Sequence, residues 1–251
     1  MDLKLQDKVV LVTGASRGIG AAIARQLGAC GATVIVNYYS NQGQAEEVLA
    51  AVKEGGGTGM LYQADVREAA AVRAMVDHAV AEFGPIDVLF NNANIKFPVK
   101  PFMEMSWEEI HGKLSDEMQA LYNCSQAVVP SMIERRSGKL IFVSSTLSRQ
   151  PGAGFAAHCA AKSAVDAIAK VMAFELGAYG ITVNVLAPGL VITDATAQQP
   201  KEMHRQIAAI TPLKRIALPE DIAGTAVMLA SPHTDYLTGQ YISVNGGAFM
   251  L

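Results

Sequence analysis

Two side chains that can carry protons stand four residues apart in the run GAGFAAHCAAKSAV, which begins at Gly152. His158 supplies an imidazole and Lys162 an ammonium, and most of their neighbours are alanine or other small residues. On a helix, residues that are four apart lie on the same face. The run therefore predicts a helix that presents both groups side by side, a pairing suited to proton transfer.

A second segment with chemical meaning, VVLVTGASRGIGAAIARQLG, lies near the start of the chain. An apolar run that predicts a strand leads into a glycine-rich turn and then into a helical pattern. Gly14 permits the tight turn, Gly18 lets backbone amides approach a pyrophosphate, and Gly20 lets the helix pack closely on the strand. The N-terminus of the helix adds a partial positive charge, so the segment predicts a dinucleotide-binding turn.

The elements that must position these residues alternate along the chain. Seven short apolar runs predict buried strands: KVVLVTG, ATVIVNY, GMLYQAD, IDVLFNN, GKLIFVSS, ITVNVLAPG and QYISVNGG. Continuous apolar runs are typical of a parallel sheet that is covered on both faces. Amphipathic segments such as AAIARQLGACG lie between them. With no linker and no repeat, the pattern predicts one α/β domain over residues 1–251, a doubly wound parallel sheet with helices on both faces.

These motifs together resemble the short-chain dehydrogenase/reductase family. The glycine turn has the spacing TGxxxGxG, and NNA, ADV, APG and LTGQYISVNGG follow it in order. The resemblance extends from Asp7 to Gly247 and is strongest to members that act as 3-oxoacyl-carrier-protein reductases. It implies a Rossmann-type fold, a nicotinamide cofactor and oxidoreductase activity.

The resemblance also implies which residues do the chemistry. In this family a tyrosine protonates the substrate oxygen as hydride arrives, while a lysine, a serine and a helix asparagine assist it. The serine position falls on Ser145 and the lysine position on Lys162. The tyrosine position holds His158, the asparagine position holds Glu117, and Asn94 replaces a glycine beside the nicotinamide.

These departures leave three functions open. The first is an NADP(H)-dependent reductase of a carbonyl or imine in a small metabolite or polyketide-like substrate, with His158 as proton donor. The second is a non-redox lyase, dehydratase, isomerase or cyclase that uses Glu117 and His158 as acid and base. The third is a catalytically silent NADP(H)-binding homologue. We favour the first, because the substituted groups are polar and ionisable. Lys162 should lower the pKa of His158 and a nearby Glu117 should raise it, and the sequence does not decide between them.

The choice of cofactor rests on the end of the second predicted strand. An NAD site would place a carboxylate there, whereas this chain has VNYYS, with Asn37 and Tyr38. Arg17 in the glycine turn can pair with a 2′-phosphate, so we predict NADP(H). The resemblance adds Asp65 at the adenine and Thr193 near the nicotinamide amide or pyrophosphate. The other residues expected to contact the cofactor are Ser16, Ile19, Val66, Asn91, Ala93, Lys162, Pro188 and Gly189.

Composition bounds the partners. The net charge of −3 and the pI near 6.0 argue against nucleic acid or an anionic membrane as the main partner. The three cysteines have no metal-binding spacing, and no metal is expected. We expect a cytoplasmic protein that binds a small-molecule substrate, in a site lined by Asn94, Lys96 and Phe97. The basic turn ERRSGK is a possible contact for an acyl carrier protein.

Assembly is expected from the family and from one local feature. The helix that carries His158 and Lys162 continues as AVDAIAKVMAFELGAYG, with small and apolar residues around most of its circumference. Such a helix needs burial on more than one side. We therefore expect a homotetramer, with this helix and the one that carries Glu117 at one interface and the C-terminal SVNGGAFML at another.

Overall fold

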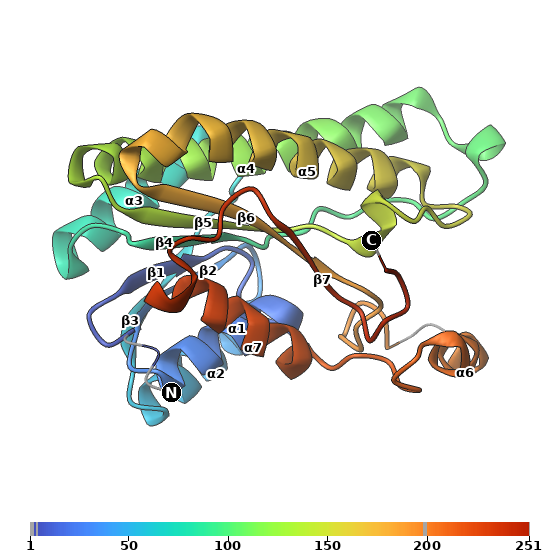
Figure 1. Cartoon of the computed structure of the whole chain (residues 1–251), viewed down its shortest axis with the longest axis horizontal. Helices are drawn as coiled ribbons and strands as arrows, with labels where there is room; N and C mark the ends of the chain where they lie inside the picture. Colours follow the sequence, from blue (N-terminus) through green and yellow to red (C-terminus); the bar gives the residue numbers. More distant parts are fainter. Residues whose placement is uncertain (1–2, 4, 198–199, 251) are drawn as a thin grey trace.

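The computed structural model describes residues 3, 5–197 and 200–250, and seven parallel strands form its single sheet. The strand order is β3-β2-β1-β4-β5-β6-β7 (Figure 1). All seven strands predicted from the sequence are present: β1 Val9–Val12, β2 Thr33–Tyr38, β3 Thr58–Gln63, β4 Val88–Asn91, β5 Gly138–Val143, β6 Ile181–Pro188 and β7 Tyr241–Val244. The predicted fold class, a doubly wound parallel sheet, is confirmed.

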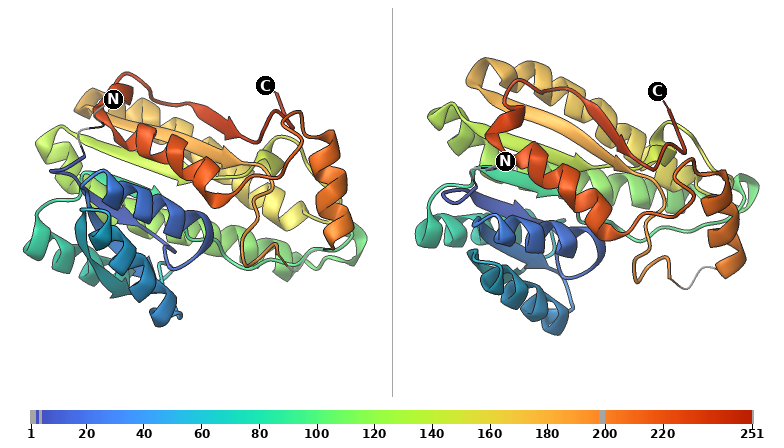
Figure 2. Two further views of the ribbon diagram at one scale, coloured as in Figure 1. Left: turned by 90° about the horizontal axis from the view of Figure 1, so that it is seen from below. Right: turned by 60° about the horizontal axis from the view of Figure 1, so that its bottom comes forward.

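Two layers of helices cover the sheet. One layer contains α3, α4 and α5, and the other contains α1, α2 and α7 (Figures 1 and 2). Helix α6 lies at the end of the molecule, beside the C-terminal segment. The bounds are α1 Gly18–Ala29, α2 Gln42–Glu54, α3 Ala69–Phe83, α4 Trp107–Arg135, α5 Ala156–Leu176, α6 Lys201–Ile210 and α7 Pro219–Ala230. Short 3-10 turns span η1 Phe102–Glu104, η2 Thr146–Ser148, η3 Gly177–Tyr179 and η4 Pro232–Thr234.

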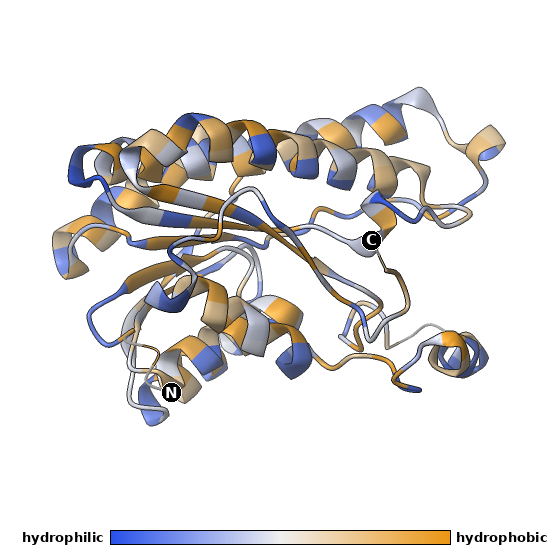
Figure 3. Cartoon of the chain, in the orientation of Figure 1, coloured by the Kyte–Doolittle hydropathy of each residue, from blue (hydrophilic) through white to orange (hydrophobic). Residues whose placement is uncertain are grey.

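Strand β1 shows why the apolar runs are continuous. Val10 and Val12 pack into the core under α1 and α7, whereas Val9 and Leu11 pack into the core under α3 and α4. Alternate residues of a strand point to opposite faces, and here both faces are buried. The strands between the helical layers are accordingly mostly hydrophobic (Figure 3).

The direction in which successive strands are added to the sheet reverses between β1 and β4. The strands that follow β1 in the chain, β2 and β3, lie on one side of it, and β4 pairs with it in parallel on the other side, with Leu11 opposite Leu89. In doubly wound sheets, ligands bind outside the carboxyl ends of the strands at this point of reversal. The glycine turn follows β1, and the NNAN segment follows β4, so both lie at this place.

Helices α4 and α5 pack side by side along the sheet. A capping box fixes the start of α4, because Ser106 accepts from the backbone of Glu109 and Glu109 accepts from the backbone of Ser106. Both helices carry large apolar side chains that solvent reaches, including Tyr122, Val171 and Phe174. Within the described part of the chain, no helix is long and apolar enough to cross a membrane.

Candidate active site

The glycine turn after β1 is closely packed against the segment after β4. A Cβ on Gly14 would lie 2.8 Å from the Cα of Ala93, and Gly14 also has a positive φ of 61°. A Cβ on Gly20 would collide with the side chain of Asn92 and with the Gly14 carbonyl. Glycine is therefore required at both positions, by conformation at the first and by space at the second.

The N-terminus of α1 fits the phosphates of a dinucleotide. Arg17 occupies the N-cap position, and no described side chain caps the helix or places an acid in its first turn. Its amides and dipole are thus available to an anion. The Arg17 side chain is exposed and forms no hydrogen bond or ion pair with the described residues. Ser16 and Ile19 flank it in the turn, and Thr193 packs against Gly18, since a Cβ there would lie 3.3 Å from the Thr193 methyl.

Two residues that the sequence analysis did not single out hold this turn in place. The Thr13 hydroxyl accepts a hydrogen bond from the backbone of Ala93 at 3.0 Å. The side-chain amide of Asn92 donates to the carbonyls of Thr13 at 2.8 Å and Gly14 at 3.2 Å. The signal for Asn92 was its place in the quoted NNA motif, directly after a strand. A polar side chain there can satisfy the backbone of a turn on the neighbouring strand.

We also expected Asn37 and Tyr38 among the residues that contact the cofactor, and the structure buries both side chains. Asn37 accepts from the Gly14 amide at 3.1 Å and donates to the Ala64 carbonyl at 3.1 Å, and it is buried. Tyr38 packs into the core beneath α1 and α2. Asn37 therefore holds the glycine turn through its side chain, and the Tyr38 side chain belongs to the core. No carboxylate stands at the end of β2, as the sequence indicated.

Other expected cofactor residues lie at the carboxyl ends of neighbouring strands. Asp65 follows β3 and forms an ion pair with Arg67 at 2.6 Å, whose hydrogen bond holds the pKa of Asp65 below its ordinary value. Val66 and Asn91 line a small pocket, described below. Pro188 ends β6, and Gly189 donates its amide to the Val244 carbonyl at 3.1 Å. These residues share one edge of the sheet.

Lys162 and Glu117 meet across α5 and α4. The Lys162 ammonium donates to the Glu117 carboxylate at 2.5 Å and to the Val143 carbonyl at 2.8 Å. Both side chains are at most 5% exposed. Burial alone would raise the pKa of Glu117, but Lys162 and Lys113 together lower it to about 2. Glu117 is therefore a buried, ionised counter-charge to the two ammonium groups.

Lys113 is the second cation on Glu117, and the sequence analysis missed it. Its ammonium donates to Glu117 at 2.5 Å, to the Asn94 side chain at 3.0 Å and to the Ile95 carbonyl at 2.8 Å. Burial lowers the pKa of Lys113 to about 8 although Glu117 opposes this shift. The available signal was its position four residues before Glu117 on one helix face.

His158 is buried on α5 under an aromatic ring. The Phe97 ring stacks on the imidazole, with 4.3 Å between the ring centroids. The centroids of the Phe97 and Phe155 rings are 6.3 Å apart. Nδ1 of His158 is buried without a hydrogen-bond partner among the described residues. Burial, followed by the charges of Lys162 and Lys113, lowers the pKa of His158 to about 3, against the opposing effect of Glu117.

The question that the sequence left open is thereby answered: burial and the two ammonium groups outweigh the carboxylate, and the imidazole is neutral at physiological pH. A neutral imidazole is a hydrogen-bond donor and a poor acid. The lowered pKa therefore speaks against His158 as an imidazolium acid at physiological pH.

The backbone of Ser145 is held in place through its carbonyl group. Its carbonyl accepts hydrogen bonds from the hydroxyls of Tyr241 at 3.1 Å and Ser148 at 2.8 Å. The Ser148 Oγ also lies 2.6 Å from the carboxyl group of the buried Asp166. The Ser145 Oγ accepts from the Leu147 amide at 3.2 Å, which leaves its own proton free to be donated.

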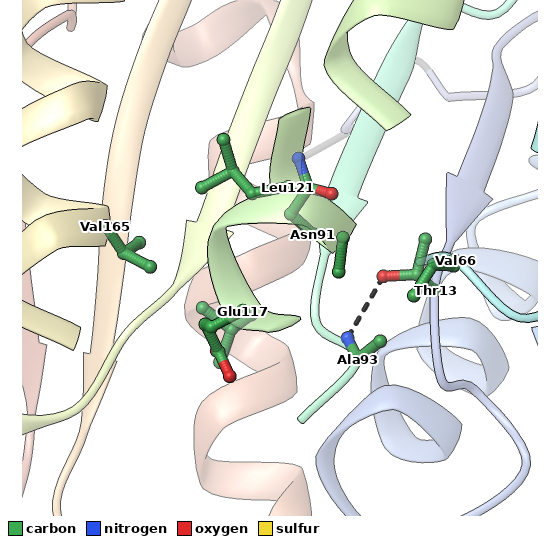
Figure 4. A pocket seen from close by; sticks show the side chains of 9 residues that line it. Thr13, Val66, Asn91, Ala93, Glu117, Leu121 and Val165 are labelled. Atoms are coloured by element: carbon green, nitrogen blue, oxygen red, sulfur yellow. Dashed lines mark hydrogen bonds between the residues drawn. The ribbon is translucent and has the colours of Figure 1, made fainter. Parts of the chain in front are cut away.

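A small pocket joins the glycine turn to this charged cluster. Figure 4 shows Thr13, Ala93 and Asn91 on one side of it and Glu117 on the other. The remaining lining residues are Val66, Ala120, Leu121, Val143 and Val165. Of the expected substrate-lining residues, Asn94 and Phe97 contact the cluster through Lys113 and His158, whereas Lys96 is exposed. The described residues contain no group of three His, Cys, Asp or Glu side chains arranged to hold a metal.

The sheet topology, the glycine turn at its point of reversal and a buried lysine paired with a carboxylate beside this turn are the features of a Rossmann-type oxidoreductase site. Comparisons agree with this class. A family model described as enoyl-(acyl carrier protein) reductase matches residues 14–248. The chain belongs to this family, within the short-chain dehydrogenases/reductases.

Similar proteins include reductases of known class. The chain is 39% identical over 245 residues to the 3-oxoacyl-[acyl-carrier-protein] reductase FabG of Staphylococcus aureus, with 97% of this chain and 98% of that protein covered. It is 37% identical to an uncharacterized oxidoreductase of Methylorubrum extorquens, with 97% and 98% covered. A solved variant of a Serratia marcescens short-chain dehydrogenase/reductase superposes with a TM-score of 0.89 at 35% identity, with 97% and 98% covered.

Proposed function

We propose that the protein is an NADP(H)-dependent reductase of a carbonyl group, in a substrate of the 3-oxoacyl or polyketide-like class. The observation that carries the proposal is the pocket that Thr13, Asn91 and Ala93 share with Glu117, the partner of Lys162. It joins a dinucleotide-binding turn to groups that can stabilise charge. A carbonyl is preferred over an imine because relatives bear the name 3-oxoacyl reductase. The reductase and oxidoreductase names of the relatives given above favour redox chemistry over the non-redox alternative.

The roles of the residues follow from their protonation states. NADP(H), when bound, supplies the hydride. The Ser145 hydroxyl and a ring N–H of His158 donate hydrogen bonds to the substrate oxygen. Because Nδ1 of His158 is buried without a partner, we assign the donor to Nε2. The negative charge that develops on this oxygen is stabilised by the ammonium of Lys162 in a site that excludes water. Hydride adds to the carbonyl carbon, and the alkoxide that forms takes its proton from water as the product leaves. His158 is thus a hydrogen-bond donor of fixed position and not an imidazolium acid.

The preference for NADP(H) rests on two features. The end of β2 offers no carboxylate to a ribose 2′-hydroxyl, because Asn37 is turned inward. Arg17 is exposed at the start of α1 and is free to pair with a 2′-phosphate.

An acyl carrier protein remains a proposed partner on the strength of the relatives' names, but the basic turn ERRSGK is a poor surface for it. The Arg135 guanidinium binds Asp87 at 3.0 Å, and Lys139 binds Asp235 at 2.6 Å. Arg136 donates to the Ala178 carbonyl. The turn leads into the amino end of β5, whereas the pocket lies at the carboxyl end.

We also propose a cytoplasmic homotetramer, with the exposed apolar side chains of α4 and α5 at one interface.

The test is NADPH oxidation, followed by absorbance, with 3-oxoacyl thioesters of increasing chain length, both free and linked to an acyl carrier protein. We expect stoichiometric NADPH loss and a 3-hydroxyacyl product. Binding of NADPH without oxidation across the whole panel would favour the silent homologue. Product formed without NADPH loss would overturn the proposal in favour of non-redox chemistry.

A further inference from the structure

Lys113 is a buried cation in the active site to which the family resemblance gives no role. Its side chain is 1% exposed, and its ammonium contacts three acceptors: Glu117 on the same helix, and Asn94 and the Ile95 carbonyl after β4. An ammonium has three protons to donate. All three are used within the protein, so Lys113 has none left for a substrate.

The three acceptors belong to different parts of the site. Glu117 is the counter-charge of Lys162, and Asn94 and Ile95 begin the loop that continues to Phe97. The Lys113 ammonium also lies 5.1 Å from the centre of the Phe97 ring. A cation at this distance attracts the face of an aromatic ring. Lys113 thus ties helix α4 to the loop that covers His158.

The position of Phe97 determines the surroundings of His158. The two rings are stacked, with 4.3 Å between their centres and 21° between their planes. This ring excludes water from one face of the imidazole and helps to keep it neutral. A displaced loop would expose the imidazole, so the contacts of Lys113 act on His158 without touching it.

We propose that Lys113 is a positioning residue, which holds Phe97 on His158 and Glu117 on Lys162. The inference rests on the proposed function only in that the proposed function gives His158 and Lys162 their roles in carbonyl reduction. It explains why Asn94, Glu117 and His158 occur together: Asn94 and Glu117 are both ligands of the Lys113 ammonium, and the loop that Asn94 begins carries the ring that covers His158.

Lys113→Met is the direct test, because methionine keeps the length of the side chain and removes the charge and the donors. The cluster still pairs Glu117 with Lys162, so no carboxylate is left without a partner. The readout is the NMR signal of His158, assigned among the five histidines with a His158→Gln variant. In the unaltered protein we expect a ring-current shift from Phe97 and no titration near neutral pH.

In Lys113→Met we expect the ring-current shift to shrink and the pKa of His158 to rise toward its ordinary value. Phe97→Leu defines complete loss of the ring-current shift. Lys139→Met is the matched control, since Lys139 is an ion-paired, largely buried lysine outside the site, and it should change neither readout. If Lys113→Met does not fold, Asn94→Ala removes one acceptor without touching the buried charges, and a smaller change of the same sign is expected.

The kinetic readout separates positioning from folding. Lys113→Met should lower kcat by up to about 100-fold, as a misplaced catalytic group does, while the KM for NADPH changes little. The effect of Lys113→Met on kcat should be smaller when Glu117→Gln is already present, because the ion pair between Lys113 and Glu117 is then already lost. An unchanged shift and pKa of His158 in Lys113→Met or, if that variant does not fold, in Asn94→Ala would overturn the proposal. The NMR result needs no turnover, so it stands even if no reductase activity is found.

Discussion

The Lys162 ammonium lies 2.5 Å from the Glu117 carboxylate, in a place where both side chains are almost fully buried. The charge that balances Lys162 thus comes from the neighbouring helix. His158, one turn before Lys162 on its own helix, stays neutral. In the family pattern, the ionisable partner of the lysine is the phenol of a tyrosine at that turn. Here a carboxylate behind the lysine takes over the balance of charge.

Glu117→Gln should destabilise the protein strongly, because it leaves two buried ammonium groups that repel each other. Removal of one partner from a buried ion pair typically costs about 3–5 kcal/mol. Urea unfolding, followed by circular dichroism, measures this free energy. Glu109→Gln is the matched control, since Glu109 pairs with Lys100 at the surface and its loss should matter far less. Equal stability of Glu117→Gln and the unaltered protein would refute the ion-paired cluster.

The free energy of unfolding should fall as the pH drops below about 6.5, through His158. The folded pKa is lowered to about 3, so between 6.5 and 3 the unfolded chain binds a proton that the folded protein does not. The slope is at most ~1.4 kcal/mol per pH unit for one such group. Glu117 adds its own loss only below its ordinary pKa of 4.5.

Urea unfolding between pH 6.5 and 5 therefore isolates the histidine. His158→Gln should flatten the profile in this window, whereas His78→Gln, on an exposed side chain, should leave it unchanged. An identical slope with and without His158 would mean that the imidazole is charged or solvated in the folded protein.

His158→Ala should lower kcat on the order of 10²–10³-fold, the usual effect of losing one fixed donor to a developing oxyanion. NADPH affinity should hardly change, and steady-state kinetics with direct titration measures both. The alkaline side of the pH profile should show no imidazole pKa. His158→Tyr should restore reduction of simple ketones only if the site is a decayed form of the family's. Full activity of His158→Ala would leave the residue with a packing role.

Arg17→Ala should erase most of the preference for NADPH over NADH. The guanidinium is exposed at the N-cap of α1 and has no partner in the described chain, so its removal should not disturb the fold. Calorimetric titration with both cofactors measures the two affinities. Equal affinities in the unaltered protein would contradict the argument from the missing carboxylate at β2.

Phe174→Asp should dissociate the proposed homotetramer. Phe174 is 90% exposed on α5, and a charge there would have to be buried in an interface. Light scattering at micromolar concentration measures the mass. Val80→Asp, on the exposed side of α3, is the control and should leave the mass unchanged. If the unaltered protein is a monomer, the proposed interface is refuted.

The seven strands, the glycine turn and the shared helix face of His158 and Lys162 could be predicted from the sequence, because each is encoded in local periodicity. Apolar runs report burial on both faces, and a spacing of four reports one side of a helix. Even Glu117 was identified by its place in the family's pattern. Its state of charge was not.

The tertiary structure alone decided how the site is charged. Glu117 meets Lys162 although the two are 45 positions apart in the chain, and Lys113 reaches the loop after β4, because the sheet order places α4 beside α5 and the carboxyl end of β4. The pKa of His158 depends on the water that Phe97 and the surrounding chain exclude. Spacing in a sequence orients a side chain, but its protonation is set by desolvation and by charges from distant segments, which only the folded chain brings together.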